Sequence, residues 1–297
     1  MTWTMLVAAL LFSASLAAAN HQGDYTSSIE DWRREHQKRL TTDNGWLTVT
    51  GLFFLREGDN SFGSDPLNDI VIPEGPEHAG VFNLHDRQVT IITPVDQMLI
   101  VNGEQVSHAR LYPREQPTTV TIGALTLMVH TSGERLAIRM RDKNSDLWQN
   151  FSGLRWYPVN GTYRVPARFI PHDEPISVKI QNILGDIETY TSHGSAALSI
   201  KGQELRMLSL TAGNRLWFIF RDLTSGTETY PAARFLYSDA PEDGSLIIDF
   251  NMAYNPPCAF SPYTTCPLPP QDNRLPVRVE AGELNYMGPV PTSIDIN

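Results

Sequence analysis

The residues best suited to chemistry gather near the C-terminal end of the chain. Between positions 249 and 283 the sequence places acids, amides and an arginine among aromatic residues and prolines. Carboxyl groups can serve as general acids or bases, amides both donate and accept hydrogen bonds, and an arginine can hold a carboxylate or phosphate through two hydrogen bonds. The catalytic candidates are Asp249, Glu280 and Glu283, and the binding candidates are Asn251, Asn255, Asn273 and Arg274.

The composition of this segment suits two different roles. A stiff loop rich in proline can display polar groups to a ligand. It can also be a structural plug, in which prolines pack on aromatic rings while Asn and Asp satisfy backbone groups. Because an arginine is costly to bury without a partner, we expect Arg274, Asn251 and Asn255 to meet at the main concavity of the second half of the chain.

An apolar run at the start of the sequence predicts export. Met5–Ala19 carries no charge, ends in three alanines and gives way to polar residues at Asn20. It is shorter than the roughly 20 residues that a membrane span needs, so we interpret it as a cleaved secretory signal. The mature protein is expected to start near Asn20 and to be periplasmic or secreted, without a membrane span. In such an oxidising compartment Cys258 and Cys266 are predicted to form a disulfide.

The rest of the sequence carries no familiar catalytic or cofactor signature. The formal net charge is -10 and no stretch concentrates Lys and Arg, which argues against a nucleic-acid partner. The histidines do not stand at metal-ligand spacings, and there is neither a Gly-x-Ser-x-Gly elbow nor a Gly-rich phosphate loop. We therefore expect no metal and no cofactor.

The elements that must position the candidate residues are mostly strands. Ser27–Thr42 opens with a capping-box pattern and carries an imperfect apolar stripe, which predicts one amphipathic helix. After it, short β-prone runs alternate with turn residues, as in sandwiches and barrels. The sequence thus predicts an all-β fold of two sandwich- or barrel-like lobes. Its parts are a signal peptide (1–19), a helix segment (20–44), a sandwich-like lobe (45–143) and a second β lobe with the Pro-rich loop (144–297).

Three segments of the chain resemble one protein family. Asp249–Glu283, Trp46–Gly63 and Gly226–Phe235 are similar to the family catalogued as domain of unknown function 1684. The resemblance implies a shared fold, and it implies no activity because the family has none assigned. Tyr230 and Arg234, which lie in the third segment, join the binding candidates.

A second resemblance lies in the first half of the chain. Gly63–Ile70 followed by Glu77–Gly80 is similar to the forkhead-associated domain, a β-sandwich that reads phosphothreonine peptides. Ser64 and Gly75 stand where that family has the Arg and Ser that hold phosphate. The resemblance therefore implies the fold without phosphopeptide binding, and a structural role for His78.

Two classes of function remain open on the sequence. In the first, the chain is an exported binding or structural protein whose C-terminal loop meets an unknown small molecule or an envelope component. In the second, it is a small hydrolase that uses the carboxylates of Asp249, Glu280 and Glu283. We favour the first class, because no catalytic motif stands out.

Overall fold

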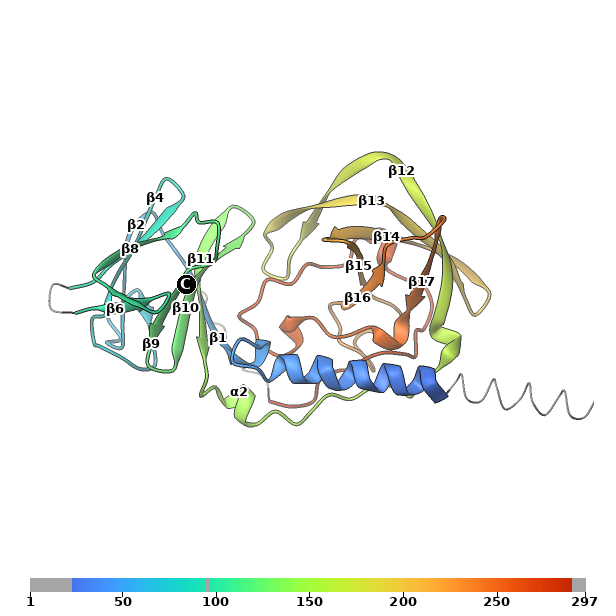
Figure 1. Cartoon of the computed structure of the whole chain (residues 1–297), viewed down its shortest axis with the longest axis horizontal. Helices are drawn as coiled ribbons and strands as arrows, with labels where there is room; N and C mark the ends of the chain where they lie inside the picture. The colour runs from blue at the N-terminus through green and yellow to red at the C-terminus, as the bar shows by residue number, and fades with distance from the viewer. Residues whose placement is uncertain (1–22, 95–96, 290–297) are drawn as a thin grey trace, which may run out of the picture.

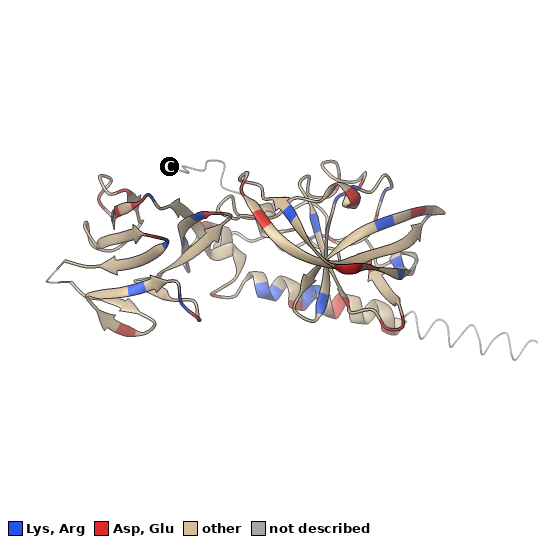
Figure 2. Cartoon of the chain, turned by 90° about the horizontal axis from the view of Figure 1, so that it is seen from above, with Lys and Arg blue, Asp and Glu red and all other residues tan. Residues whose placement is uncertain are grey.

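The computed structural model describes residues 23–94 and 97–289, and the run that predicts export lies outside them. The chain is mainly β, as the sequence predicts, and forms two lobes of strands with a helix along the second lobe (Figure 1). Acidic and basic residues are interspersed over both lobes in Figure 2. No helix within the described ranges is long and apolar enough to span a membrane.

The first lobe packs a six-stranded sheet against a five-stranded sheet. Burial alternates along the strands, as on β5, where Val89 and Ile91 point into the core. The rings of Phe62 and Phe82 meet there with centroids 4.3 Å apart. In spatial order the larger sheet is β1 (Val49–Phe54), β11 (Arg135–Asp142), β10 (Leu125–Ser132), β9 (Thr119–Ile122), β6 (Leu99–Val101) and β7 (Glu104–Val106). The smaller is β3 (Ile70–Val71), β2 (Gly58–Gly63), β4 (Gly80–His85), β5 (Gln88–Ile92) and β8 (His108–Tyr112).

The second lobe is a single antiparallel sheet curled into a nearly closed barrel (Figure 1). Its two longest strands have 18 and 14 residues and pair with each other in antiparallel register. Its interior is a core of aliphatic and aromatic side chains. In spatial order the strands are β16 (Arg234–Asp239), β15 (Arg215–Phe220), β14 (Gln203–Ala212), β13 (Ile187–Ile200), β12 (Arg164–Gln181) and β17 (Ser245–Asp249).

Strand β15 is apolar on both of its faces. Leu216, Phe218 and Phe220 point into the barrel core. Trp217 and Ile219 point the other way and pack in a second cluster on the outside of the barrel. Because successive residues of a strand face opposite sides, this run of apolar residues predicts that other parts of the chain cover the outer face.

The N-terminal helix supplies part of that cover. It is helical from residue 23 to residue 40, so it is already formed before the predicted start of Ser27–Thr42 and ends two residues earlier. Ile29, Arg33, His36 and Leu40 lie on one face of the helix and are each at most 7% exposed. Two of these four side chains are polar, which the apolar stripe in the sequence does not reveal.

The connecting segments contain only short helices. The Pro-rich stretch after β17 has little regular structure, as its composition predicts. It nevertheless follows a buried course along the barrel, and many of its residues are enclosed. The short helices are η1 (Trp46–Thr48), α2 (Asp146–Gln149), η2 (Gly161–Tyr163), η3 (Phe250–Met252), η4 (Pro257–Ala259) and η5 (Gln271–Asn273).

Candidate functional site

A cleft of about 530 Å³ lies on the outer face of β15 and β16. The N-terminal helix with residues 44–46 forms one wall, and the segment 252–260 forms another. Concave, mostly apolar sites with a few polar groups are the usual binding sites for small molecules. We call this site the aromatic cleft, because seven aromatic residues line it: Trp32, Trp46, Trp217, Phe235, Tyr237, Tyr254 and Phe260.

Three of these rings are nearly parallel. The register of β15 and β16 pairs Trp217 with Tyr237, and their ring planes differ by 10° with centroids 6.0 Å apart. Tyr237 and Tyr254 differ by 17° at 6.4 Å. The ring of His36, from the helix, lies 4.7 Å from that of Tyr254. Contacts between aromatic rings thus join the two strands, the Pro-rich segment and the helix.

A buried carboxyl group lies behind the aromatic cleft. Glu283 is fully buried and accepts hydrogen bonds from the backbone N–H and Nδ2 of Asn255, at 3.0 and 2.9 Å. Burial raises the pKa of Glu283 to about 8. Burial, together with the charge of Arg39, lowers the pKa of His36 to about 4. Since His36 Nε2 lies 3.7 Å from Glu283 Oε2, a protonated carboxyl group faces a neutral imidazole at pH 7.

Asn255 connects this pair to the aromatic cleft. Its Nδ2 donates to Glu283 Oε1 and to the Leu284 carbonyl, at 2.9 and 2.8 Å, which fixes the orientation of the amide. Its Oδ1 is buried and has no hydrogen-bond partner among the described residues, and the same is true of Trp217 Nε1. Buried polar atoms are nearly always paired, so these two unpaired atoms stand out among the side chains that line the cleft.

The backbone that carries Glu283 is held tightly against its neighbours. Gly282 has a φ of +84°, and a Cβ atom there would lie 2.6 Å from the Ala253 carbonyl oxygen and 2.8 Å from that of Phe250. Only glycine combines that conformation with that close approach. The next N–H, that of Glu283, donates to the Ala253 carbonyl at 2.8 Å. Gly282 therefore fixes the point at which Glu283 enters the interior.

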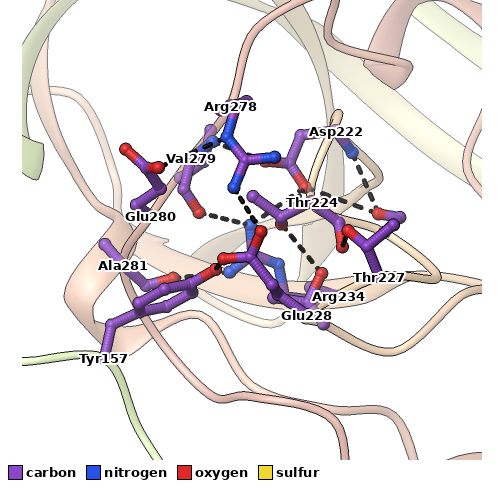
Figure 3. Close-up of polar contacts among 12 residues, drawn as sticks. Tyr157, Asp222, Thr224, Thr227, Glu228, Arg234, Arg278, Val279, Glu280 and Ala281 are labelled. Carbon is purple, nitrogen blue, oxygen red and sulfur yellow. Dashed lines mark hydrogen bonds and ion pairs between the residues drawn. The ribbon is translucent and has the colours of Figure 1, made fainter.

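Arg234, a predicted binding residue, is fully buried and does not line the aromatic cleft. Its Nη2 lies 3.2 Å from Asp222 Oδ1 and donates to the Val279 carbonyl at 3.1 Å, while Nη1 donates to the Ala281 carbonyl. Figure 3 shows these contacts beside the more exposed pair of Arg278 and Glu228. The guanidinium group thus fastens the segment just before Glu283 to the barrel.

Asp249 and Asn251 join the N-terminal helix to the barrel rather than lining the aromatic cleft. Asp249 Oδ2 accepts a hydrogen bond from the Tyr25 hydroxyl at 2.9 Å. Asn251 Nδ2 approaches the same hydroxyl at 3.0 Å and donates to the Asn160 carbonyl at 2.9 Å. The Arg33 guanidinium donates to the Asn251 carbonyl at 3.4 Å. The polar atoms of both candidates are occupied by the protein itself.

Asn273 and Arg274 face opposite directions. Asn273 is buried, and its side chain accepts from the Leu208 N–H at 2.7 Å and donates to the Leu208 and Ile219 carbonyls. Arg274 is exposed, and its side chain makes no hydrogen bond or ion pair within the described part of the chain. The expectation that Arg274 lies at the main concavity is wrong. The segment forms a bridge between Arg274 and Arg221, the residue that follows β15. This pairing turns Asn273 and Leu275 inward and Arg274 outward.

The three carboxylate candidates have no partner in common. Glu280 lies at the surface, where Lys201 Nζ at 2.8 Å and Arg278 Nε at 3.3 Å hold its pKa below the usual value. Asp249 contacts the helix, and Glu283 contacts Asn255 and the His36 ring. No observation thus brings two of them together as an acid–base pair.

The predicted disulfide between Cys258 and Cys266 is not formed. Both residues are free thiols, and they are not at bonding distance. Hydrogen bonds and packing hold the loop instead: the Cys258 N–H donates to Cys266 Sγ at 3.1 Å, and Cys266 is buried in the outer cluster beside β15. Tyr230, a predicted binding residue, donates its hydroxyl to the Cys258 carbonyl at 2.9 Å and so also belongs to the scaffold.

The polar residues of the segment that resembles the forkhead-associated domain, and His172 in the second lobe, make hydrogen-bond contacts within the protein. Ser64 Oγ donates to the Gly75 carbonyl at 3.0 Å, and His78 Nδ1 lies 3.4 Å from Asn68 Oδ1, so the positions that resemble a phosphopeptide reader contact the protein itself. His172 Nε2 lies 3.2 Å from a serine hydroxyl of β13. Among residues 23–94 and 97–289, no group of three or more His, Cys, Asp or Glu side chains is placed to hold a metal ion.

Of the nine predicted catalytic and binding residues, only Asn255 lines the aromatic cleft, with Glu283 directly behind it. The residues that the sequence does not single out are mostly aromatic: Trp32 on the helix, Trp217 on β15 and Tyr237 on β16. One signal for them exists in the sequence. Arg215–Phe220 is apolar at five successive positions, which is more than one buried face requires.

Comparisons with known proteins find a family and a similar solved protein. A search of curated proteins finds no match. The solution structure of the uncharacterized protein from gene locus rrnAC0354 of Haloarcula marismortui is similar at 30% sequence identity and a TM-score of 0.39, covering 45% of this chain and 77% of that one. A family model matches residues 149–284, a range that excludes the similar segment Trp46–Gly63. Through its second lobe the chain belongs to the family described as protein of unknown function (DUF1684).

Proposed function

We propose that the protein binds a small molecule in the aromatic cleft. The observation that carries this proposal is the unpaired Oδ1 of Asn255, which is enclosed in a side chain only 2% exposed and lies at the wall of an apolar cleft. An unpaired buried acceptor costs about 1–3 kcal/mol. A ligand that donates a hydrogen bond to it recovers that free energy. The Pro-rich segment contributes by holding Asn255, Pro257 and Phe260 in a fixed wall.

The hydrolase alternative has less support. Hydrolysis of a glycoside needs two carboxyl groups about 5–10 Å apart on either side of the bond. Asp249 and Glu280 are each engaged with other parts of the protein, and Glu283 is enclosed behind Asn255. No observation therefore favours this second function.

Binding can be tested by tryptophan fluorescence, because three of the six tryptophans of the chain line the aromatic cleft. Fractions of a small-molecule extract are expected to change the tryptophan fluorescence and to raise the unfolding free energy, by about 2.7 kcal/mol at a hundred times Kd. Trp217→Leu should abolish both effects. Trp148→Leu, which removes a half-buried tryptophan that does not line the cleft, should keep them. Equal binding by both variants would contradict the proposal.

We also propose that the protein acts in the periplasm or outside the cell. The support is the uncharged run Met5–Ala19 with its terminal alanines. Intact-mass measurement of the protein purified from its native host should give a chain that starts at or near Asn20. A cytoplasmic protein that retains Met1 would contradict this location.

A further inference from the structure

The shape of the aromatic cleft selects for flat ligands. The rings of Trp217, Tyr237 and Tyr254 lie within 10–17° of parallel from one to the next. The guanidinium group of Arg215 lies 5.3 Å from the centre of the Tyr237 ring and extends this series to the rim. Aromatic faces favour offset stacking with another planar ring. An aliphatic ligand would fill the same volume without using these parallel faces.

The unpaired atoms at the wall require a ligand that both donates and accepts. Asn255 Oδ1 can only accept, because the contacts of Nδ2 with Glu283 and Leu284 fix the amide orientation. Trp217 Nε1 can only donate. Both atoms are buried and unpaired among the described residues, and both belong to side chains that line the cleft. A nitrogen heterocycle can carry both the donor that Asn255 Oδ1 needs and the acceptor that Trp217 Nε1 needs on the edge of one flat ring.

The charges at the rim favour an anion. The described residues that line the cleft include Arg39 and Arg215 and no Asp or Glu, in a protein whose formal net charge is -10. Arg39 makes no ion pair within the described ranges, and its nearest polar contact is His36 Nδ1 at 3.5 Å. The one carboxylate near Arg215 is Asp239, 3.5 Å away on a side chain that is 96% exposed. Both guanidinium groups are therefore free to meet a ligand's negative group.

We infer that the ligand is a planar nitrogen heterocycle that bears an anionic group, with its ring against Trp217 and Tyr237 and its anion between Arg39 and Arg215. This inference rests on the proposed function and narrows it. Two kinds of compound combine such a ring with an anionic group: phosphorylated nucleosides and heteroaromatic carboxylates.

Matched probes separate the features of the ligand. Adenosine 5′-monophosphate is compared with adenosine, which lacks the anion, and with ribose 5-phosphate, which lacks the ring. Benzimidazole-5-carboxylate, whose ring both donates and accepts a hydrogen bond, is compared with benzimidazole, which lacks the anion. Binding to the full chain is measured by calorimetry and tryptophan fluorescence at low salt. At least one of the two ring anions should bind about tenfold or more tightly than its neutral counterpart, because charge-assisted hydrogen bonds are the strong ones. Which of the two binds identifies the kind of compound. Ribose 5-phosphate should not bind.

Substitutions of the two arginines that line the cleft test the anion site, and a substitution of a third arginine outside the cleft is the control. Arg39→Gln and Arg215→Gln should each weaken the ring anion about tenfold or more and leave its neutral counterpart unchanged. Arg274→Gln, which removes an exposed arginine outside the cleft, should change neither. If neutral and anionic rings bind equally and Trp217→Leu removes both, the ligand class is wrong while the proposed function stands. If none of the probes binds, or if ribose 5-phosphate binds as well as the ring anions, the inference is overturned.

Discussion

Replacing Arg234 with methionine should lower the unfolding free energy by about 3–5 kcal/mol, the usual cost of removing one partner of a buried ion pair. Both Arg234 and Asp222 have fully buried side chains. Asp222 also accepts from the Val279 N–H and, at 2.8 Å, from the Thr224 hydroxyl. The variant therefore leaves a buried carboxylate with neutral partners and no opposite charge. The guanidinium group also lies 4.9 Å from the centre of the Phe220 ring, and methionine fills only part of that volume.

Chemical denaturation of matched variants would measure this effect. Arg274→Met changes an exposed arginine without a side-chain partner and should stay within about 0.5 kcal/mol of the wild type. Adding Asp222→Asn to Arg234→Met should cost less than the sum of the single changes, because the second change removes a charge that the first leaves unpaired. Similar stability of the Arg234 and Arg274 variants would show that the buried pair does not hold segment 279–281.

Stability should fall by about 1 kcal/mol between pH 6.5 and pH 8, and Glu283 is the cause. Its pKa is about 8 in the folded protein and about 4.3 when unfolded, so the folded state binds the extra proton in this range. That contribution is complete below pH 4.3 and is lost as the pH rises through 8. His36 acts in the opposite sense, since its pKa falls from about 6.5 to about 4 on folding. The effects of Glu283 and His36 cancel between about pH 4.3 and 6.5. Above pH 6.5 the unfolded chain loses its remaining protons from His36 and from His130, whose pKa burial lowers to about 3 in the folded protein, and this offsets part of the decline.

The variant Glu283→Gln tests the assignment. An amide keeps a donor that can face His36 Nε2 and cannot ionise. The unfolding free energy of this variant should therefore show no decline between pH 6.5 and 8, and it should rise slightly as the unfolded histidines lose their protons. It loses the hydrogen bond that Oε2 accepts from the Asn255 N–H, which costs about 0.5–1.5 kcal/mol at every pH. Glu280→Gln is the matched control, because that carboxylate is exposed, and it should retain the decline. A decline that persists in Glu283→Gln would assign the pH dependence to another group.

The sequence was sufficient for the fold class and for the character of the Pro-rich segment. Alternating apolar residues and frequent turns predict strands directly. The predicted helix is real, but Ser27 is not its N-cap, because residues 23–26 are already helical. The position of Arg274 could not be predicted in this way, because alternation in an irregular segment depends on a single bridge to Arg221. The burial of Arg234 could not be predicted either. Its partner Asp222 follows β15 and is separated from β16 by residues 223–233, and the two side chains become buried together only when the barrel forms.

The aromatic cleft could not be predicted from the sequence either, because it is formed by residues that are far apart along the chain. Its rings come from positions 32–46, 215–237 and 252–260, and each ring read alone is a plausible core residue. Only folding shows that Trp217 and Tyr237 share a register on the outside of the barrel. The predicted disulfide failed because it rested on the compartment of the protein, whereas the loop is held by packing and by contacts such as that of Cys258 N–H with Cys266 Sγ.

The helix that forms one wall of the cleft also has a consequence for solubility. Its side chains Trp32 and His36 pack against Tyr254, and it lies along the outer face on which Trp217 and Phe235 stand. A large apolar patch left uncovered on a protein surface favours association with other molecules. The helix therefore shields the outer face of the barrel from other chains while it leaves room for the cleft.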